Sequence, residues 1–165
     1  MVATRKGLIA EEVPLAAGQD GEIVCAKITL TNSQPLFICA YYRPPHDTVS
    51  ALDSLELALD ELSTKCENNP RTCVIVAGDF NAPGIDWETC TIKPDGRNKG
   101  ICEKLLGTLD QFHLTQLVTA PTRNEATLDL FCTNKPGLVK SCSLVPGISD
   151  HDGIIIVNCR HKPKS

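Results

Sequence analysis

Runs of apolar residues separated by turn-forming clusters divide the chain into strands and helices. β-branched and other apolar residues gather into short runs, and clusters rich in Asn, Ser, Pro and Gly lie between them. The cluster Thr31–Pro35 joins the first two runs, which are therefore expected to form a hairpin. The predicted strands are Glu22–Leu30, Leu36–Tyr42, Cys73–Ala77, Thr115–Val118, Thr127–Thr133, Val139–Val145 and Gly153–Cys159.

Two stretches instead repeat their apolar residues at steps of three and four, a spacing that predicts amphipathic helices. The first is Val49–Cys66, with Asp47 or Thr48 as its N-cap, and Asn68–Pro70 ends it. The second covers about Asn98–Phe112. A helix followed by a near-continuous apolar strand favours a layered α/β architecture, and the run of later strands favours a mixed sheet.

Composition and charge narrow the class of protein. The chain has 165 residues, of which 42% are hydrophobic and 22% charged, which is enough for one globular domain with a core. The net charge of -4 argues against a broad basic surface for nucleic acid, although a bound cation can supply positive charge inside a site. No apolar run approaches the roughly 20 residues that span a bilayer, so no membrane partner is expected.

Nine cysteines form no Cys-x-x-Cys pair, so the spacing typical of zinc ligands is absent. Several lie in or beside apolar runs, where a free cysteine behaves as a small buried hydrophobe. The odd count, without a signal-peptide-like stretch, favours a reducing interior, nuclear or cytoplasmic, and no disulfide-linked partner. The cysteines in or beside apolar runs are Cys25, Cys39, Cys73, Cys132 and Cys159.

The strongest candidate for chemistry is Gly78-Asp79-Phe80-Asn81, where the strand Cys73–Ala77 runs out. Residues two apart on a strand share one face, so Asp79 and Asn81 are expected to lie together. A carboxylate beside a carboxamide suits a divalent cation and a water that must be oriented. The alternative is an ordinary Asx-turn, because Asp and Asn are common turn residues.

Three further polar clusters lie near the ends of strands, and each has a plain structural alternative. Tyr42, in Tyr41-Tyr42-Arg43-Pro44-Pro45, could be a core aromatic with its hydroxyl at the surface. Asp129 could pair at a strand edge, and Ser149-Asp150-His151-Asp152 could be a polar turn. Together with Asp79 and Asn81, however, the clusters supply the acids, amide, phenol and imidazole needed for metal-assisted hydrolysis of a phosphate ester.

In this combination and order the motifs resemble the endonuclease/exonuclease/phosphatase superfamily, related to DNase I, and most of all the endonuclease domain of LINE-type retrotransposons. The resemblance extends from about Gly7 to Cys159. It implies a DNase I-like α/β sandwich of two packed mixed sheets flanked by helices. The motifs that carry it are Gly78–Trp87, Leu114–Val118 with Pro121–Arg123, Thr127–Leu130 and Pro146–Asp152.

The resemblance also implies a role for each matching residue. Asp79 corresponds to the acid that activates or orients the attacking water and contacts the metal, and Asn81 to the amide that orients this acid and contacts phosphate. Tyr42 corresponds to the tyrosine that positions the scissile phosphate. His151 corresponds to the histidine that stabilises the pentacovalent phosphate or takes a proton, and Asp129 to the acid that orients this histidine.

The resemblance implies further contacts around these residues. Asp150 corresponds to an acid at the metal, Thr122 to a DNA-contacting threonine, and Ser149 to a residue that assists at the phosphate. The implied cofactor is Mg²⁺ or Mn²⁺, and the implied partner is DNA. Substrate selectivity is expected in the polar segment Ala82–Lys99, predicted as a long functional or mobile loop, and near Thr122.

Two motifs of the superfamily have no match in this chain: an Asn near the end of the first strand and a metal-ligating Glu at the end of a later one. Glu11, Glu12 and Glu22 precede the hairpin, but none follows the required strand. The chain is therefore interpreted as N-terminally truncated, with residues 1–159 forming a partial domain and 160–165 a basic tail expected to be disordered. Loss of a carboxylate should weaken binding of Mg²⁺.

Three functions follow from the resemblance. The leading one is metal-dependent phosphodiester hydrolysis by a DNA-nicking endonuclease of retrotransposon type. The first alternative is an inactive remnant of that domain or a partial gene model, which the missing Asn and Glu motifs favour. The second alternative is a phosphatase acting on small phosphoesters, against which Ile85-Asp86-Trp87 and Leu114–Val118 count.

Overall fold

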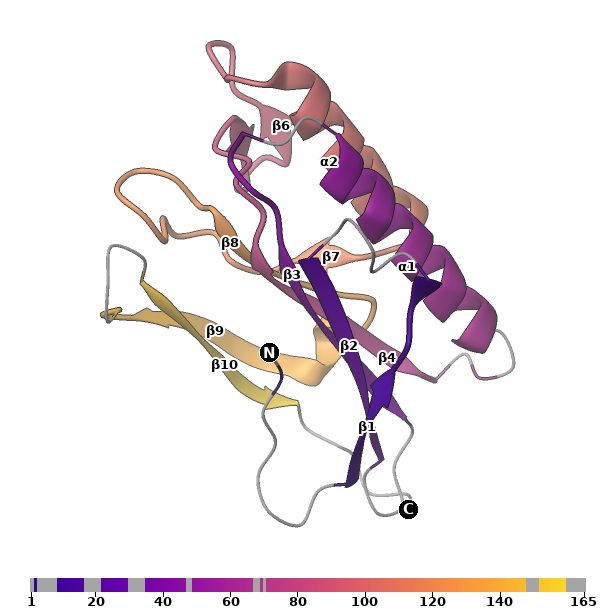
Figure 1. Ribbon diagram of the computed structural model, residues 1–165. Coiled ribbons are helices and arrows are strands. Elements are labelled where there is room, and N and C mark those ends of the chain that lie inside the picture. Colours follow the sequence, from indigo (N-terminus) through magenta and orange to yellow (C-terminus); the bar gives the residue numbers. More distant parts are fainter. Residues whose placement is uncertain are drawn as a thin grey trace.

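The computed structural model describes residues 2, 9–16, 22–29, 35–46, 49–66, 69, 71–147 and 152–159, the last five of these without their side chains. A mixed sheet in the order β1-β2-β3-β4-β8-β7 forms the centre of the molecule (Figure 1). The pair β3–β4 is parallel and the other pairs are antiparallel. The strands are β1 Ile9–Val13, β2 Glu22–Thr29, β3 Leu36–Tyr42, β4 Cys73–Asp79, β7 Thr115–Gln116 and β8 Asp129–Thr133.

Two helices, α1 Ser50–Cys66 and α2 Lys99–Gln111, lie side by side against one face of this sheet (Figure 1). The apolar stripe of each helix packs on strand residues that alternate toward this face, such as Cys39 and Val76, both fully buried. Lys104 of α2 lies 2.8 Å from carboxylate oxygens of both Asp53 and Glu56 of α1, so ion pairs add to the apolar contact between the helices.

The opposite face carries a second, smaller sheet, the hairpin of β9 Val139–Val145 and β10 Gly153–Cys159, which follows the 3₁₀ turn Pro136–Leu138. The hairpin packs on Cys73, Ile75 and Phe131 of the large sheet. Figure 1 shows the helices and the hairpin on opposite sides of the large sheet. Two packed sheets with helices outside confirm the predicted fold class.

The helices and most strands lie where the hydrophobic pattern predicts them, but two regions differ. The segment Ala82–Lys99 contains a small hairpin of β5 Ile85–Asp86 and β6 Thr91–Ile92, so it is folded rather than a long irregular loop. Its Ile85 and Trp87 are 3% and 7% exposed and join the core under α2. Strands of two residues are too short to show a period, which is why the polar composition alone predicted a loop.

The edge strand β1 was also not predicted, because Glu11 and Glu12 interrupt its apolar residues and all of Ile9–Glu12 is exposed. Such charged, exposed positions are typical of edge strands, which gain their order from pairing with the neighbouring strand. The predicted N-cap residues Asp47 and Thr48, the residues Asn68 and Pro70, and the tail 160–165 lie outside the described residues. Within the described part of the chain, no helix is both long enough and apolar enough to cross a membrane.

Candidate active site

Strand register brings three of the predicted site residues into one row. Tyr42, at the end of β3, is the register partner of Asp79 in β4, and Asp79 is the partner of Asp129 in β8. Paired residues on neighbouring strands point to the same face, so the three side chains lie side by side across three strands. The face is that of the β9–β10 hairpin, because Ala77 and Phe131, two residues further along their strands, pack against it.

The end of β4 turns sharply and holds the Asp79 carboxylate. Gly78 has φ 146°, and a Cβ at this position would lie 1.8 Å from the carbonyl oxygen of Tyr41, so only glycine fits. The main-chain N–H of Asn81 donates a hydrogen bond to Asp79 Oδ1 at 3.0 Å. This is the geometry of an Asx-turn. The turn also orients the Asp79 carboxylate, so the Asx-turn and a functional role for Asp79 are compatible.

Asn81 adopts a left-handed backbone conformation, with φ 46°. Its side-chain Nδ2 donates to the carbonyl oxygen of Arg43 at 2.7 Å, which fixes the orientation of the carboxamide. Oδ1 is then the acceptor that the amide presents, and an amide oxygen suits a cation or a water molecule. The side chains of Asp79 and Asn81 are both half-buried, so they are held by the fold and still reach solvent.

Thr122 connects the row to the hairpin. It is 1% exposed, and its Oγ1 accepts hydrogen bonds from the main-chain N–H groups of Leu128 and Asp129, each at 3.0 Å. Its carbonyl oxygen accepts from the N–H of Asp152 at 2.7 Å, and Asp152 Oδ1 accepts from Gly147 N–H at 3.4 Å. Thr122 therefore positions the start of β8 and the residue before β10, and its contact with DNA stays a prediction.

Ser149, Asp150 and His151 lie in residues 148–151, outside the described part of the chain. The described chain stops at Gly147 on one side and resumes at Asp152 on the other, where Val145 and Gly153 are register partners. Asp152 is bonded to Thr122, which also holds the N–H of Asp129. The roles of the three residues therefore stay predictions, but the described end of their segment is tied to the row that contains Asp129.

Arg43 is the site residue that sequence reasoning missed. It lies in the quoted cluster after Tyr42, but a charged residue at the end of a strand normally faces water, so nothing in the pattern distinguished it. In the structure it is fully buried, and its Nη1 donates to the carbonyl oxygen of Asn81 at 3.0 Å. Asp152 was also left out of the prediction, and its carboxylate closes the turn to Gly147.

The donor set of the row fits a hard divalent cation. The carboxylates of Asp79 and Asp129 come from directly paired positions, and Asn81 adds an amide oxygen. Mg²⁺ is commonly held by one or two carboxylates together with water and substrate phosphates, so this number of oxygen ligands is sufficient. Among the described residues, no three His, Cys, Asp or Glu side chains come close enough to form a closed metal cage.

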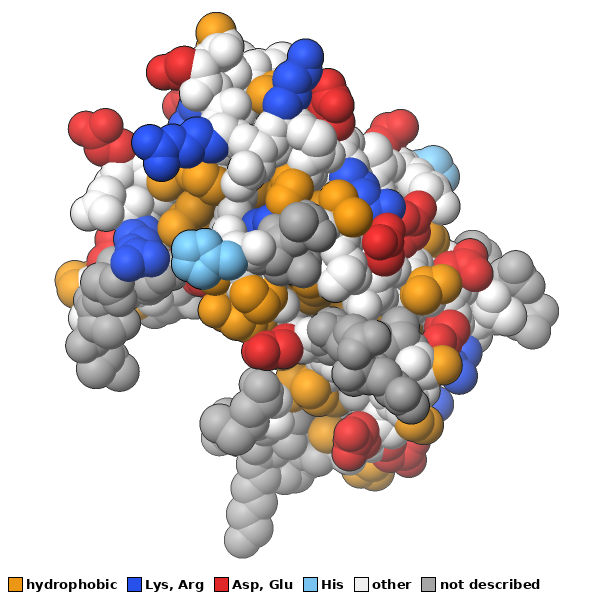
Figure 2. Space-filling view, turned by 45° about the horizontal axis from the view of Figure 1, so that its top comes forward, with side chains coloured by type: hydrophobic (Ala, Val, Ile, Leu, Met, Phe, Trp, Pro, Cys, Tyr) orange, Lys and Arg blue, Asp and Glu red, His pale blue; other side chains and the backbone are white. Residues whose placement is uncertain are grey.

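The surface around this end of the molecule is of mixed charge. In the view of Figure 2, which brings the top of Figure 1 forward, Lys and Arg side chains are scattered among Asp and Glu rather than gathered in one patch. The mixture agrees with the net charge of -4. On this face, the described side chains form no broad basic surface.

Comparison with solved structures gives the fold class. The chain resembles an endonuclease/exonuclease/phosphatase family protein from Leptotrichia buccalis, with 18% identity and a TM-score of 0.51 over 82% of this chain and 52% of that one. A second such protein, from Beutenbergia cavernae, has 13% identity and a TM-score of 0.54 over 91% and 43%. The 3' phosphatase NExo from Neisseria, bound to product DNA hairpin, has 12% identity and a TM-score of 0.55 over 90% and 70%.

These likenesses establish a fold of the endonuclease/exonuclease/phosphatase class, and this chain spans 52% and 43% of the length of the first two structures. A family model described as endonuclease-reverse transcriptase matches residues 36–155, which is more than half of the chain. The chain therefore belongs to this family. No curated protein matches it.

Proposed function

We propose that this chain cleaves phosphodiester bonds in DNA in a metal-dependent reaction, as a nicking endonuclease of retrotransposon type. The observation that carries the proposal is the row of Tyr42, Asp79 and Asp129 across three paired strands. Polar residues that only form turns would not be expected to occupy paired positions on one face of three neighbouring strands. A phenol and two carboxylates in one row match the needs of phosphate ester hydrolysis.

Asp79 is proposed to orient the attacking water. Its carboxylate is held by the Asn81 N–H at 3.0 Å, so one oxygen is committed and the direction of the other is set. In-line attack on phosphorus depends on the direction of the nucleophile, which a carboxylate in a rigid turn can define. The Asn81 amide, whose Nδ2 is held by the Arg43 carbonyl oxygen, keeps its own oxygen as an acceptor and is proposed to contact the phosphate.

Tyr42 is proposed to position the scissile phosphate, and its 37% exposure leaves it accessible to a large substrate. Asp129 is proposed to orient His151, which would stabilise the charged phosphate or take a proton. An acid behind an imidazole selects the tautomer and favours the imidazolium. The path from Asp129 through Thr122 to Asp152, next to His151 in the chain, supports this pairing.

Asp79 and Asp150, together with the amide oxygen of Asn81, are the residues proposed to hold Mg²⁺ or Mn²⁺. When bound, the cation would neutralise charge on the phosphate oxygens and polarise the ester. With a net charge of -4, the chain would gain from this contribution in binding a DNA substrate. Ser149 and Thr122 are kept as proposed substrate contacts, and residues 82–99 as the segment that selects the substrate.

A second candidate is a domain that keeps the fold without catalysis. It is favoured by the lack of a match for the Asn and Glu motifs of the superfamily. A third candidate is a phosphatase for small phosphoesters, which the name of the Neisseria 3' phosphatase keeps in consideration. The endonuclease and the phosphatase act on different substrates and the inactive domain acts on neither, so assays with plasmid DNA and a small phosphoester distinguish all three.

The proposal is tested by nicking of supercoiled plasmid in Mg²⁺ and in Mn²⁺, with EDTA as the metal-free reference. His151→Ala is expected to lower the nicking rate by about 10²-fold or more, because general acid–base groups contribute on this scale. Asp110→Asn is the matched control, since Asp110 is an exposed acid on α2, outside the row, and should nick at the wild-type rate.

Each outcome supports one candidate. Nicking that needs the cation and is lost in His151→Ala supports the endonuclease. A folded wild-type chain that neither nicks plasmid nor hydrolyses a small aryl phosphate supports the inactive domain. Hydrolysis of the aryl phosphate without nicking supports the phosphatase and overturns the proposal.

A further inference from the structure

Arg43 is the largest fully buried side chain in the described part of the chain. It follows Tyr42 directly, and Tyr42 is the register partner of Asp79. A guanidinium loses its hydration when it is buried, so its presence here is costly unless it makes specific contacts. A long apolar residue would fill a similar volume without that cost, so the contacts of Arg43 need an explanation.

Those contacts converge on the turn that carries the candidate catalytic groups. The Arg43 main-chain N–H donates to the carbonyl oxygen of Asp79 at 2.9 Å. The Arg43 carbonyl oxygen accepts from Asn81 Nδ2 at 2.7 Å, and Arg43 Nη1 donates to the Asn81 carbonyl oxygen at 3.0 Å. One residue thus holds the end of β4, the Asn81 side chain and the Asn81 backbone together.

The backbone that Arg43 holds is in a conformation that is costly for most residues. Asn81 has φ 46°, and its N–H is the donor that orients the Asp79 carboxylate. If the Asn81 peptide rotated, that hydrogen bond would break and both site side chains would change direction. Strained conformations of this kind persist only where surrounding contacts fix them.

The region around the Arg43 side chain is closely packed, since Arg43 is 0% exposed. Burial raises the pKa of the Cys102 thiol, and the positive charge of Arg43 acts in the opposite direction, so Cys102, in α2, is close enough to the guanidinium to be affected by its charge. A Cβ on Gly84 would lie 2.9 Å from the Cys102 sulfur, so this region has little spare space. A Cys102 variant therefore tests packing around Arg43 without removing its bonds to Asn81.

We infer that Arg43 is a positioning residue, whose buried guanidinium holds Asn81 in its left-handed conformation and thereby aims the Asp79 carboxylate and the Asn81 carboxamide at the substrate. The inference rests on the proposed function where it concerns turnover. Where it concerns the geometry of the turn, it rests only on the contacts of Arg43. The purely structural alternative is that Arg43 fills space between the sheet and α2.

The test compares Arg43→Met, which keeps length and removes charge and donors, with Arg43→Lys, which keeps the charge without the planar guanidinium. Cys102→Ala is the matched control for lost packing in the same region. The first readout is hydrogen exchange of the Asn81 amide, whose bond to Asp79 Oδ1 reports the turn directly. The second is the division of the nicking defect between kcat and KM.

In Arg43→Met we expect Asn81 exchange to be at least about tenfold faster and kcat to fall by about 10–100-fold, with KM for plasmid within about threefold. Arg43→Lys should lie between Arg43→Met and the wild type. Cys102→Ala should stay within about threefold of wild type in both exchange and kcat, although its melting temperature falls. Misplaced but still bound substrate is what lowers kcat without changing KM.

The inference would be overturned if the Asn81 amide exchange rate were unchanged in Arg43→Met, or if Cys102→Ala changed the exchange rate and kcat as much as Arg43→Met does. Arg43 would then be a packing residue. If Arg43→Met does not fold, Arg43→Lys decides, and exchange no faster than in Cys102→Ala overturns it. If the wild type does not nick, the proposed function fails, while the exchange comparison still decides the role of Arg43. Faster exchange without a fall in kcat of active protein would overturn the role in positioning.

Discussion

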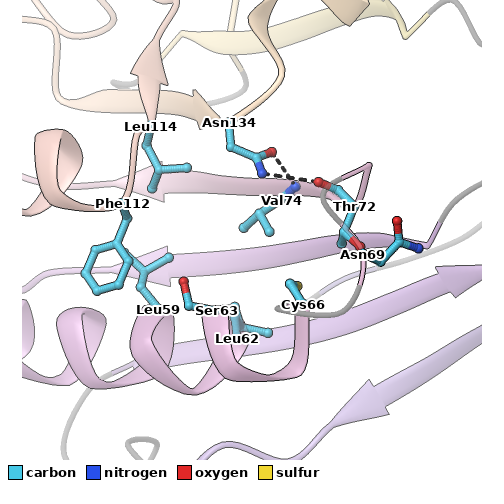
Figure 3. A pocket seen from close by; sticks show the side chains of 10 residues that line it. All are labelled: Leu59, Leu62, Ser63, Cys66, Asn69, Thr72, Val74, Phe112, Leu114 and Asn134. Atoms are coloured by element: carbon cyan, nitrogen blue, oxygen red, sulfur yellow. Dashed lines mark hydrogen bonds between the residues drawn. The ribbon is translucent and has the colours of Figure 1, made fainter.

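The two ends of β4 differ in almost every property that bears on function. The strand ends at Asp79, where Gly78 and Asn81 have positive φ and a row of polar side chains, partly accessible to solvent, lies on the face that carries the β9–β10 hairpin. It begins beside a cavity of about 350 Å³ under the ends of α1 and α2, which Figure 3 shows. The lining of the cavity is Leu59, Leu62, Ser63, Cys66, Asn69, Thr72, Val74, Phe112, Leu114 and Asn134.

The cavity has the volume of a ligand site but not its chemistry. No Asp, Glu, Lys, Arg or His is among the residues that line it. The side chain of Asn134, in the lining of the cavity, makes two hydrogen bonds (Figure 3). Its Oδ1 accepts from the Val74 N–H at 2.8 Å, and its Nδ2 donates to the Thr72 carbonyl oxygen at 3.2 Å. Asn134 is therefore used to join β8 to the start of β4.

The cavity and the polar row are separated in this fold by the length of one strand. From Val74 to Asp79 is about 17 Å at the usual rise per residue. Side chains at the start of β4 should therefore affect stability, and side chains at its end should affect turnover.

The largest effect is expected for Asp79→Asn. The substitution keeps the shape of the side chain and an acceptor for the Asn81 N–H, but it removes the negative charge that would orient water and contact a cation. Nicking should fall by about 10³-fold, while the free energy of unfolding changes by less than about 1 kcal/mol. Plasmid assays and urea unfolding of the same preparation measure both. If Asp79→Asn instead lowered stability greatly and left the turnover of the folded protein unchanged, the end of β4 would have a structural rather than a catalytic role.

Asp129→Asn should have a smaller effect, because Asp129 is proposed to act through His151. We expect nicking to fall by about 10–100-fold, with a changed pH–rate profile because the imidazole loses its charged partner. The readout is kcat measured against pH beside His151→Ala. If the double variant is no slower than His151→Ala alone, the two residues act as one unit. Additive losses would show that Asp129 acts independently of the histidine.

A feature of this site can be predicted from the sequence when it depends on neighbouring residues, and not when it depends on residues far apart along the chain. The end of β4 and its Asp79–Asn81 pair follow from local pattern, because an apolar run stops at a glycine and two polar residues. The row with Tyr42 and Asp129 does not, since register between strands far apart in sequence is set by tertiary pairing. Arg43 was missed for a related reason: its contacts are with Asp79 and Asn81, which are far from it in the sequence.

Thr122→Val tests the connection between the row and the hairpin. The substitution keeps the volume but removes Oγ1, leaving the N–H groups of Leu128 and Asp129 without that acceptor. Unfolding free energy should fall by about 2–3 kcal/mol, because buried donors left unpaired are costly. Nicking by the folded protein should fall by about tenfold as Asp129 loses its support. Thr122→Ser, which keeps Oγ1, should retain most of the activity, and equal losses in both variants would contradict this role.

At the cavity end, Leu62→Ala should change stability alone. Leu62 is 1% exposed and lines the cavity, so its truncation enlarges a void that already exists. The free energy of unfolding should fall by about 3 kcal/mol, with kcat of the folded protein unchanged. Chemical denaturation and plasmid nicking at a temperature well below the melting transition measure the two quantities. A fall in kcat would show that the two ends of β4 are coupled.

The smallest expected effect is a difference in thiol reactivity between a cysteine of the β5–β6 turn and one that lines the cavity. Cys90, in the β5–β6 turn, is exposed, whereas Cys66 lines the cavity and is half-buried. Burial raises the pKa of the Cys66 thiol, so less thiolate is present at neutral pH, and alkylation by iodoacetamide should be about tenfold slower than at Cys90. Buried Cys132, whose thiol pKa burial also raises, should react last. Peptide mapping over time gives the order, and Cys66 reacting as fast as Cys90 would mean that the cavity opens freely to solvent.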